Sequence, residues 1–195
     1  MVRVFDFDGT LVHSNESKRL AFLSLCQTDQ ERAYTLSLIE DRSLDRYRIA
    51  YYFCSQFMKS AEHFKLNLDT EINKAVHQSM VRQGAVETLT MLNEDAGLWH
   101  INSATPDDAL KELVQFFFPF VTSRSLVIGS SLGKEESLIK IASSLGVPLH
   151  NVVFYGDGID DLQASRETGC QFVPIAGGSL ELSGYKLLYR KAISL

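Results

Sequence analysis

Apolar residues near the start of the chain form a short run at positions 2–5, broken only by Arg3, and this run predicts a strand buried in a sheet. The pattern changes between residues 14 and 83, where apolar residues recur every three or four positions and neither proline nor glycine occurs. That spacing puts the apolar side chains on one face of a helix, so it predicts three to five successive helices. The helical pattern is carried by Leu20, Leu23, Leu36, Ile39, Ile49, Phe53, Phe57, Val76 and Met80.

From Gly84 onward, segments with a helical pattern alternate with short apolar runs. The runs predict strands at residues 98–101, 121–128, 151–155, 171–175 and 187–189. Helices are expected at residues 85–94, from about 106 onward, at 134–145 and in a segment ending near 169. We expect Thr105 to be the N-cap of the second of these helices, with Pro106 as its first residue, and Gly146 to end the third.

Strands that alternate with helices indicate an α/β fold, in which helices cover both faces of a parallel sheet. We expect residues 1–13 and 84–195 to form this Rossmann-like core domain. Residues 14–83 are expected to form an all-helical domain inserted into it. A chain of 195 residues is long enough for one core domain with such an insertion.

Composition argues against several classes of function. The net charge is −5 and the sequence pI is about 5.5, so the chain lacks the basic character of a nucleic-acid-binding protein. No apolar run is long enough to span a membrane and no signal-peptide pattern is present, so we expect a cytoplasmic protein. Three scattered cysteines without Cys-x-x-Cys spacing favour free thiols over a zinc site or a disulfide framework. No feature of the sequence indicates an oligomeric state.

Polar side chains follow four of the predicted strands. They are Asp6 and Asp8 after the first strand, Ser103 after the second, Lys134 after the third, and Asp157 and Asp161 after the fourth. Because ligands bind at the carboxyl ends of parallel strands, we expect these groups to converge. The pair Asp8-Gly9 alone is also typical of a surface turn. Two carboxylates at positions i and i+2, however, favour a metal ion, an acid–base role or both.

This combination of groups is the one that phosphoryl transfer requires. A carboxylate can attack phosphorus, and a second carboxyl group that holds a proton can assist the departure of the leaving alkoxide. A hard cation bound by oxygen ligands offsets the negative charge. An ammonium group and a hydroxyl can then bind the phosphate oxygens.

The same residues resemble the four motifs of the haloacid dehalogenase superfamily, in the order in which that family has them. Residues 5–12 resemble the first motif and residues 154–161 the fourth, while Ser103 is similar to the second and Lys134 to the third. The helical insertion resembles the cap of the branch that contains phosphoglycolate phosphatase and phosphoglucomutase. Members with an acid at the place of Asp8 act on phosphate esters, so the resemblance implies a phosphatase and not a dehalogenase.

The resemblance also implies a role for each residue. Asp6 is expected to be the nucleophile and Asp8 the general acid and base. Mg²⁺ is expected to be bound by Asp6, the backbone carbonyl of Asp8, Asp157 and Asp161, with Asp160 as an alternative to Asp161. The residues expected to bind the phosphate group of a small phosphorylated substrate are Ser103, Ala104 and Lys134, and Ser103 and Lys134 are also expected to assist catalysis.

Three functions are compatible with these residues. The leading hypothesis is a Mg²⁺-dependent phosphatase that hydrolyses a small phosphorylated metabolite through an aspartyl-phosphate. A phosphotransferase of the beta-phosphoglucomutase type would use the same residues but would return the phosphoryl group to a sugar. A non-catalytic phosphate-binding module would keep the fold, although the intact set of acids argues against it. The helical insertion has no pattern that identifies the substrate.

Overall fold

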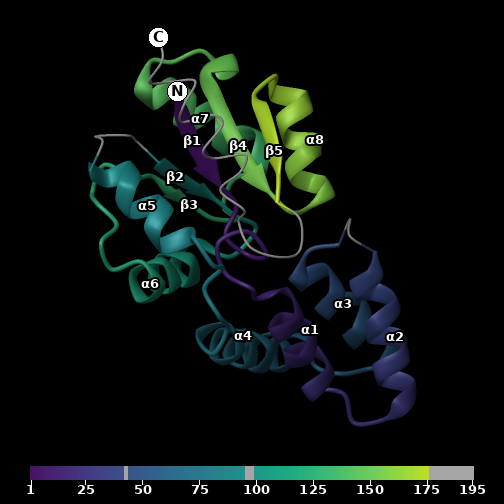
Figure 1. Ribbon diagram of the computed structural model, residues 1–195. Helices are drawn as coiled ribbons and strands as arrows, with labels where there is room; N and C mark the ends of the chain where they lie inside the picture. Colours follow the sequence, from purple (N-terminus) through teal and green to yellow (C-terminus); the bar gives the residue numbers. More distant parts are fainter. Residues whose placement is uncertain (42–43, 95–98, 176–195) are drawn as a thin grey trace. The chain divides into compact units, whose positions relative to one another are not determined.

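The computed structural model describes residues 1–41, 44–94 and 99–175 (Figure 1). The chain divides into two compact units. One consists of Met1–Val12 together with the chain from Val81 on, and the other of His13–Met80. Each unit is built on its own core.

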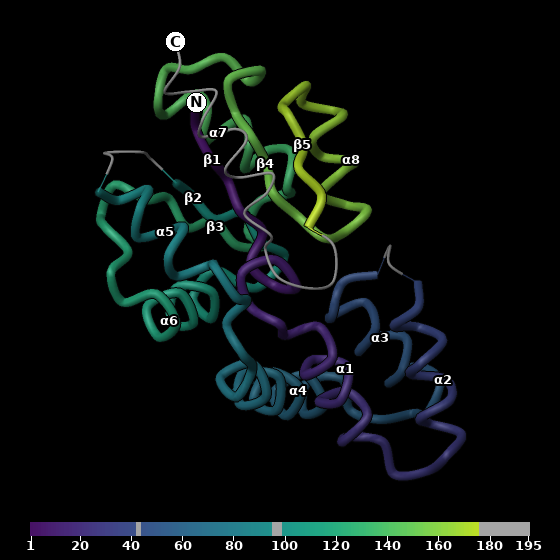
Figure 2. Tube along the Cα trace, viewed as in Figure 1, coloured from purple at the N-terminus to yellow at the C-terminus, as the bar shows by residue number. Residues whose placement is uncertain are grey.

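The first unit contains a parallel sheet of five strands in the order β3-β2-β1-β4-β5. The strands are β1 (Val2–Phe5), β2 (Trp99–Asn102), β3 (Val127–Ile128), β4 (Val152–Gly156) and β5 (Gln171–Pro174). Figure 2 shows β1 in the middle of the sheet, between β2 and β4. Val4 pairs in register with His100 of β2 and with Phe154 of β4. The carboxyl end of β1 therefore has neighbours on both sides.

Four α-helices and a short 3-10 helix, η1 (Leu149–Asn151), accompany this sheet in the described part of the chain. The α-helices are α5 (Ala85–Glu94), α6 (Asp107–Phe117), α7 (Lys134–Leu145) and α8 (Ile159–Thr168). On one face of the sheet, Val4 and Phe154 share an apolar cluster with Leu138 of α7 and Ala164 of α8. On the other face the indole Nε1 of Trp99 donates a hydrogen bond to Asn93 of α5. The α/β fold with helices on both faces is thus confirmed.

The second unit is helical. Its helices are α1 (Asn15–Ser24), α2 (Asp29–Glu40), α3 (Arg46–Phe57) and α4 (Ala61–His77). Side-chain oxygens of Thr28, Asp45 and Ser60 accept hydrogen bonds from backbone N–H groups in the first turns of α2, α3 and α4. Phe53 and Phe64 pack together inside the unit with a ring-centroid distance of 4.7 Å. The periodicity in residues 14–83 therefore predicted the right kind of structure.

Several predicted boundaries are wrong in detail. The strand predicted at 121–128 contains only Val127–Ile128, because the segment before it forms turns, one of them closed by a bond from the Ser125 N–H to the Thr122 carbonyl. Helix α6 begins at Asp107 and Thr105 does not cap it. The strand predicted at 187–189 lies outside the described residues. Gly146 ends α7 as predicted, in the left-handed conformation with φ of 64°.

Within the described residues, no helix combines the length and the apolar character that crossing a membrane would need.

Candidate active site

The loop after β1 is a tight turn that fixes two of the predicted acids. The backbone N–H groups of Leu11 and Val12 both donate to the carbonyl of Phe7. Gly9 adopts a φ of 76°, a conformation that favours glycine. Asp6, which directly follows β1, is anchored by its N–H to the Tyr155 carbonyl of β4 at 2.8 Å. Its side chain is buried at the carboxyl edge of the sheet.

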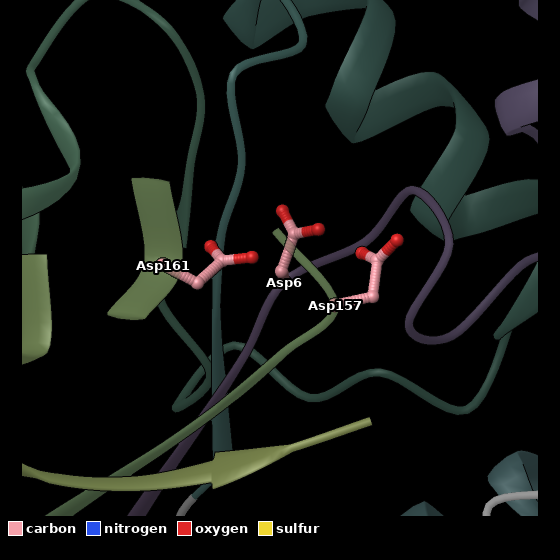
Figure 3. A group of neighbouring side chains, drawn as sticks. All are labelled: Asp6, Asp157 and Asp161. Atoms are coloured by element: carbon pink, nitrogen blue, oxygen red, sulfur yellow. The ribbon is translucent and has the colours of Figure 1, made fainter. Parts of the chain in front are cut away.

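Three carboxylates meet at this edge. Asp6, Asp157 and Asp161 each place an oxygen within 4.8 Å of the others. In the view of Figure 3, Asp6 lies between the other two, which come from the end of β4 and the first turn of α8. Three hard oxygen ligands in such proximity suit Mg²⁺. The donor set therefore fits the metal that the sequence predicts.

A glycine makes this approach possible. A Cβ on Gly156, the last residue of β4, would collide with the carboxylate of Asp161. The absence of a side chain at Gly156 lets α8 begin close enough to the sheet for Asp161 to reach Asp6. The carboxylate of Asp161 also accepts the N–H of Gly158 at 2.9 Å, which holds the first turn of the helix.

Lys134 provides a positive charge beside the acids. Its Nζ lies 3.6 Å from Asp6 Oδ1, 2.5 Å from Asp161 Oδ1 and 2.6 Å from Asp160 Oδ2. Burial alone would lower the pKa of Lys134, but the attraction of the three carboxylates outweighs it, so the pKa is raised. The amine is therefore an ammonium ion.

The acids themselves are destabilised as anions by their surroundings. Burial raises the pKa of Asp6 well above its usual value, the charge of Lys134 opposes this, and the charges of Asp161, Asp8 and Asp157 raise it further. Burial likewise raises the pKa of Asp161. A divalent cation among these oxygens would remove the repulsion.

The structure distinguishes the two neighbouring acids of α8. The side chain of Asp161 is only 1% exposed and belongs to the group with Asp6 and Asp157. The side chain of Asp160 is 53% exposed and reaches Lys134, without joining that group. The geometry therefore favours Asp161 as the ligand.

Asp107, an acid outside the predicted site, holds the loop that leads to Lys134. The carboxylate of Asp107 accepts the N–H of Gly129 and the N–H of Ser131, each at 3.0 Å. Burial acts to raise the pKa of Asp107, but hydrogen bonds from Ser131 and Gly129 outweigh it and lower the pKa. Asp107 thus ties the start of α6 to the loop before α7.

Asp8 lies outside the group of three acids and faces the loop after β2. Its Oδ2 accepts a hydrogen bond from the Thr105 hydroxyl at 2.7 Å, and the Ser103 hydroxyl is 3.5 Å away. Ser103 is buried and its oxygen accepts the N–H of Thr105, while Ala104 between them is exposed. The sequence did not indicate this role for Thr105. The available signal was a second hydroxyl two positions after Ser103.

Arg82 is buried and contacts the loop after β1. The guanidinium of Arg82 donates to the carbonyls of Gly9 and Thr10, the latter at 2.8 Å. The Thr10 hydroxyl in turn donates to Asp157 Oδ1 at 3.2 Å. Burial lowers the pKa of Arg82, and the charge of Asp157 opposes this effect. The helical pattern of residues 14–83 gave no indication of such a place for Arg82.

Comparison with known proteins adds a family match. The sequence model of the haloacid dehalogenase-like hydrolases matches residues 2–169. None of the curated proteins compared with the chain matches it.

Solved structures resemble this fold at low sequence identity. A predicted phosphoglycolate phosphatase from Haemophilus somnus is 20% identical over 91% of this chain and 86% of its own, with a TM-score of 0.68. A predicted beta-phosphoglucomutase from Thermotoga maritima is 16% identical over 96% and 91%, also with a TM-score of 0.68. CbbY from Rhodobacter sphaeroides, solved with xylulose-(1,5)bisphosphate, is 13% identical over 91% and 87%, with a TM-score of 0.64. At these identities the likeness establishes the fold.

Proposed function

Because the chain belongs to the haloacid dehalogenase-like hydrolase family, we propose that it is a Mg²⁺-dependent phosphatase acting on a small phosphorylated metabolite. The observation that carries the proposal is the convergence of Asp6, Asp157 and Asp161 within 4.8 Å, with the ammonium group of Lys134 beside them. This arrangement offers a nucleophile, a place for a cation and a counter-charge for phosphate at one edge of the sheet.

The metal would be held by the carboxylates of Asp6, Asp157 and Asp161 and by the backbone carbonyl of Asp8. When bound, Mg²⁺ supplies positive charge that offsets the charge of the transferring phosphoryl group. Lys134 contributes a second positive charge from the side of Asp6 and Asp161.

Asp6 acts as the nucleophile. One of its carboxylate oxygens attacks phosphorus, a new O–P bond forms, and the bond between phosphorus and the substrate alkoxide breaks. The product is an aspartyl-phosphate on Asp6. Water then attacks the phosphorus of this intermediate, the Asp6–phosphorus bond breaks, and inorganic phosphate leaves.

Asp8 moves the proton. In the first step its carboxylic acid gives a proton to the leaving alkoxide, and in the second step its carboxylate takes a proton from the attacking water. Its carboxylate does not belong to the group of three acids proposed to bind the metal. Thr105 orients it through the 2.7 Å hydrogen bond.

Ser103, the backbone N–H of Ala104 and Lys134 bind the phosphate oxygens. The helical unit His13–Met80 acts as the cap that selects the substrate. In this assignment the sheet unit carries the reaction, and the identity of the substrate depends on the helical unit.

A panel of phosphate esters, assayed for released phosphate with and without Mg²⁺, tests the proposal. We expect turnover of at least one ester only with Mg²⁺, and a loss of at least about a thousandfold in Asp6→Asn. Asp29→Asn, a change at the exposed start of α2, is the matched control and should turn over at the wild-type rate. Turnover by Asp6→Asn close to wild type would refute Asp6 as the nucleophile. If the wild type hydrolyses no ester of the panel, the phosphatase function is refuted.

A phosphotransferase of the beta-phosphoglucomutase type is the second candidate, because the likeness to the Thermotoga maritima protein is as strong in fold as that to the phosphatase. The same assay separates the two if isomerised sugar phosphate is measured beside free phosphate. Isomerisation faster than phosphate release would favour the phosphotransferase.

A further inference from the structure

Arg82 is a buried cation to which the proposed chemistry gives no part. It is only 3% exposed, and its guanidinium contacts the backbone of the loop after β1. Taking an arginine out of water costs free energy unless its donors find partners, so a buried arginine calls for an explanation. Two of the donors of Arg82 bind carbonyls of the loop that carries Asp8.

We propose that Arg82 is a positioning residue that fixes the metal ligand Asp157 through the loop Gly9–Leu11, an inference that rests on the proposed Mg²⁺ site. Nε of Arg82 donates to the Thr10 carbonyl at 2.8 Å, and a terminal nitrogen donates to the Gly9 carbonyl. The hydroxyl of the same Thr10 donates to Asp157 Oδ1 at 3.2 Å. Arg82 therefore reaches the ligand in two steps, the first to the backbone of Thr10 and the second from its side chain.

The backbone of Arg82 contributes to the same contact. Its N–H donates to the Leu11 carbonyl at 2.9 Å, and Val12 forms an antiparallel bridge with Val81. The segment 81–82 is thus joined to the loop by its main chain and by its side chain. Three consecutive carbonyls, those of Gly9, Thr10 and Leu11, are bound by one residue.

The geometry is specific to arginine. The guanidinium is planar and carries donors in a fixed fork, which allows one side chain to bind two neighbouring carbonyls. A lysine at this position would keep the charge but offer a single ammonium group on a flexible stem. The loop geometry therefore depends on both guanidinium contacts, with the carbonyls of Gly9 and Thr10, and not on the charge alone.

Two buried cations therefore interact with different members of the group of acids. Lys134 contacts Asp6 and Asp161 directly. Arg82 reaches Asp157 through Thr10. Lys134 acts by its charge next to the reacting groups, whereas Arg82 holds the loop in addition to the attraction between its charge and that of Asp157.

Mg²⁺ binding by calorimetry, in the absence of substrate, provides a test that does not depend on activity. The variants are Arg82→Lys, which keeps the charge, Arg82→Met, which removes it, and Thr10→Val, which removes the hydroxyl. We expect each to weaken Mg²⁺ binding by about tenfold, the usual effect of removing a partner of a metal ligand. Arg166→Met, at an exposed position in the last turn of α8, is the matched control and should bind as the wild type does.

Hydrogen exchange of the metal-free protein separates a local role from a general loss of stability. We expect faster exchange at residues 7–12 in Arg82→Lys, with the rest of the sheet unit unchanged. Faster exchange throughout the unit would overturn the positioning role. So would Mg²⁺ binding that is unchanged in Arg82→Lys and tighter in Arg82→Met, because the guanidinium would then act by charge repulsion alone.

If Arg82→Met does not fold, Arg82→Lys and Thr10→Val decide the question. If the wild type binds no Mg²⁺, the metal-dependent function falls, and the exchange of residues 7–12 still decides whether Arg82 holds the loop. Exchange there that matches the wild type would overturn the inference.

Discussion

The hydroxyl of Thr105 donates a 2.7 Å hydrogen bond to Oδ2 of Asp8, across 97 positions of the sequence. This contact joins the loop after β1 to the loop after β2, and Asp8 is not a member of the group of three acids proposed to bind the metal. In the mechanism proposed above, Asp8 must meet the leaving oxygen in a defined orientation. By holding one oxygen of Asp8, Thr105 therefore contributes to the orientation that proton transfer requires.

Replacing Thr105 by valine should lower kcat while leaving the fold intact. The change keeps the shape of the side chain but removes the donor to Asp8, and a hydrogen bond to a charged group is worth about 1.5 kcal/mol or more. We expect kcat to fall about tenfold, KM to stay close to wild type and the unfolding temperature to fall by a few degrees. Thr105→Ser retains the hydroxyl and should recover most of the rate. Equal losses in the two variants would contradict a role for the hydroxyl.

The sequence predicted the groups at the strand ends but not the contacts that orient them. Asp6 and Asp157 are recognisable because they follow apolar runs, and the chemistry of phosphoryl transfer calls for carboxylates there. Thr105 and Arg82 were missed for a physical reason. Their roles depend on hydrogen bonds across a loop, and neither periodicity nor spacing encodes such a contact. Thr105 next to Pro106 also matches the local pattern of a helix start, so the sequence suggested an N-cap and not a contact with Asp8.

The acids at positions 160 and 161 should respond differently to the same substitution. Asp161 is buried in the group with Asp6 and Asp157, whereas Asp160 is half exposed, pairs with Lys134 and does not belong to that group. We expect Asp161→Asn to weaken Mg²⁺ binding by at least about tenfold, and Asp160→Asn by less than about threefold. An asparagine at 161 can still accept the N–H of Gly158, so the helix start should persist. Calorimetric titration of both variants checks this, and a larger effect at 160 would reverse the assignment.

Replacing Gly156 by alanine should displace Asp161 and so disturb the group of acids. A Cβ there would collide with the Asp161 carboxylate, so α8 would have to shift away from the sheet. We expect Gly156→Ala to lower the free energy of unfolding by about 1–3 kcal/mol and to weaken Mg²⁺ binding. Gly133→Ala is the matched control. Its Cβ would lie 3.3 Å from the flexible end of the Glu135 side chain, and because alanine is a poorer N-cap than glycine we expect a small loss, below about 1 kcal/mol. Urea unfolding of both variants distinguishes them, and equal stabilities would contradict the collision.

The boundaries of the third strand show what local pattern leaves undetermined. Residues 121–128 have the composition of a strand, yet only Val127–Ile128 pairs with β2. The Val121 N–H bonds the Phe118 carbonyl and the Ser125 N–H bonds the Thr122 carbonyl, so turns use backbone groups that a longer strand would need. Just before β3, the Leu126 N–H donates to the imidazole of His100. A side chain on the neighbouring strand therefore takes part in setting where β3 begins.

His100 is buried in β2, on the strand next to β1. Its Nδ1 accepts the hydrogen bond from Leu126 at 3.0 Å, so in the neutral ring the proton is on Nε2. Nε2 is buried and has no hydrogen-bond partner among the described residues. Burial lowers the pKa of His100 to about 4, from an ordinary value of 6.5. The folded protein therefore holds this imidazole neutral under conditions in which the unfolded chain protonates it.

Stability should consequently fall as the pH drops from about 6.5 to about 4, because the unfolded state binds a proton that the folded state excludes. The full effect of this single group is about 3 kcal/mol, reached near pH 4 and absent above about pH 7. His100→Asn removes the titration and leaves an oxygen that can accept the Leu126 N–H. As the pH falls through this window, we expect the unfolding free energy of the wild type to decrease steadily relative to that of His100→Asn. Urea unfolding of both proteins at several pH values measures that difference, in which the other titrating groups cancel. A constant difference between about pH 7 and pH 4 would show that the imidazole is protonated inside the fold.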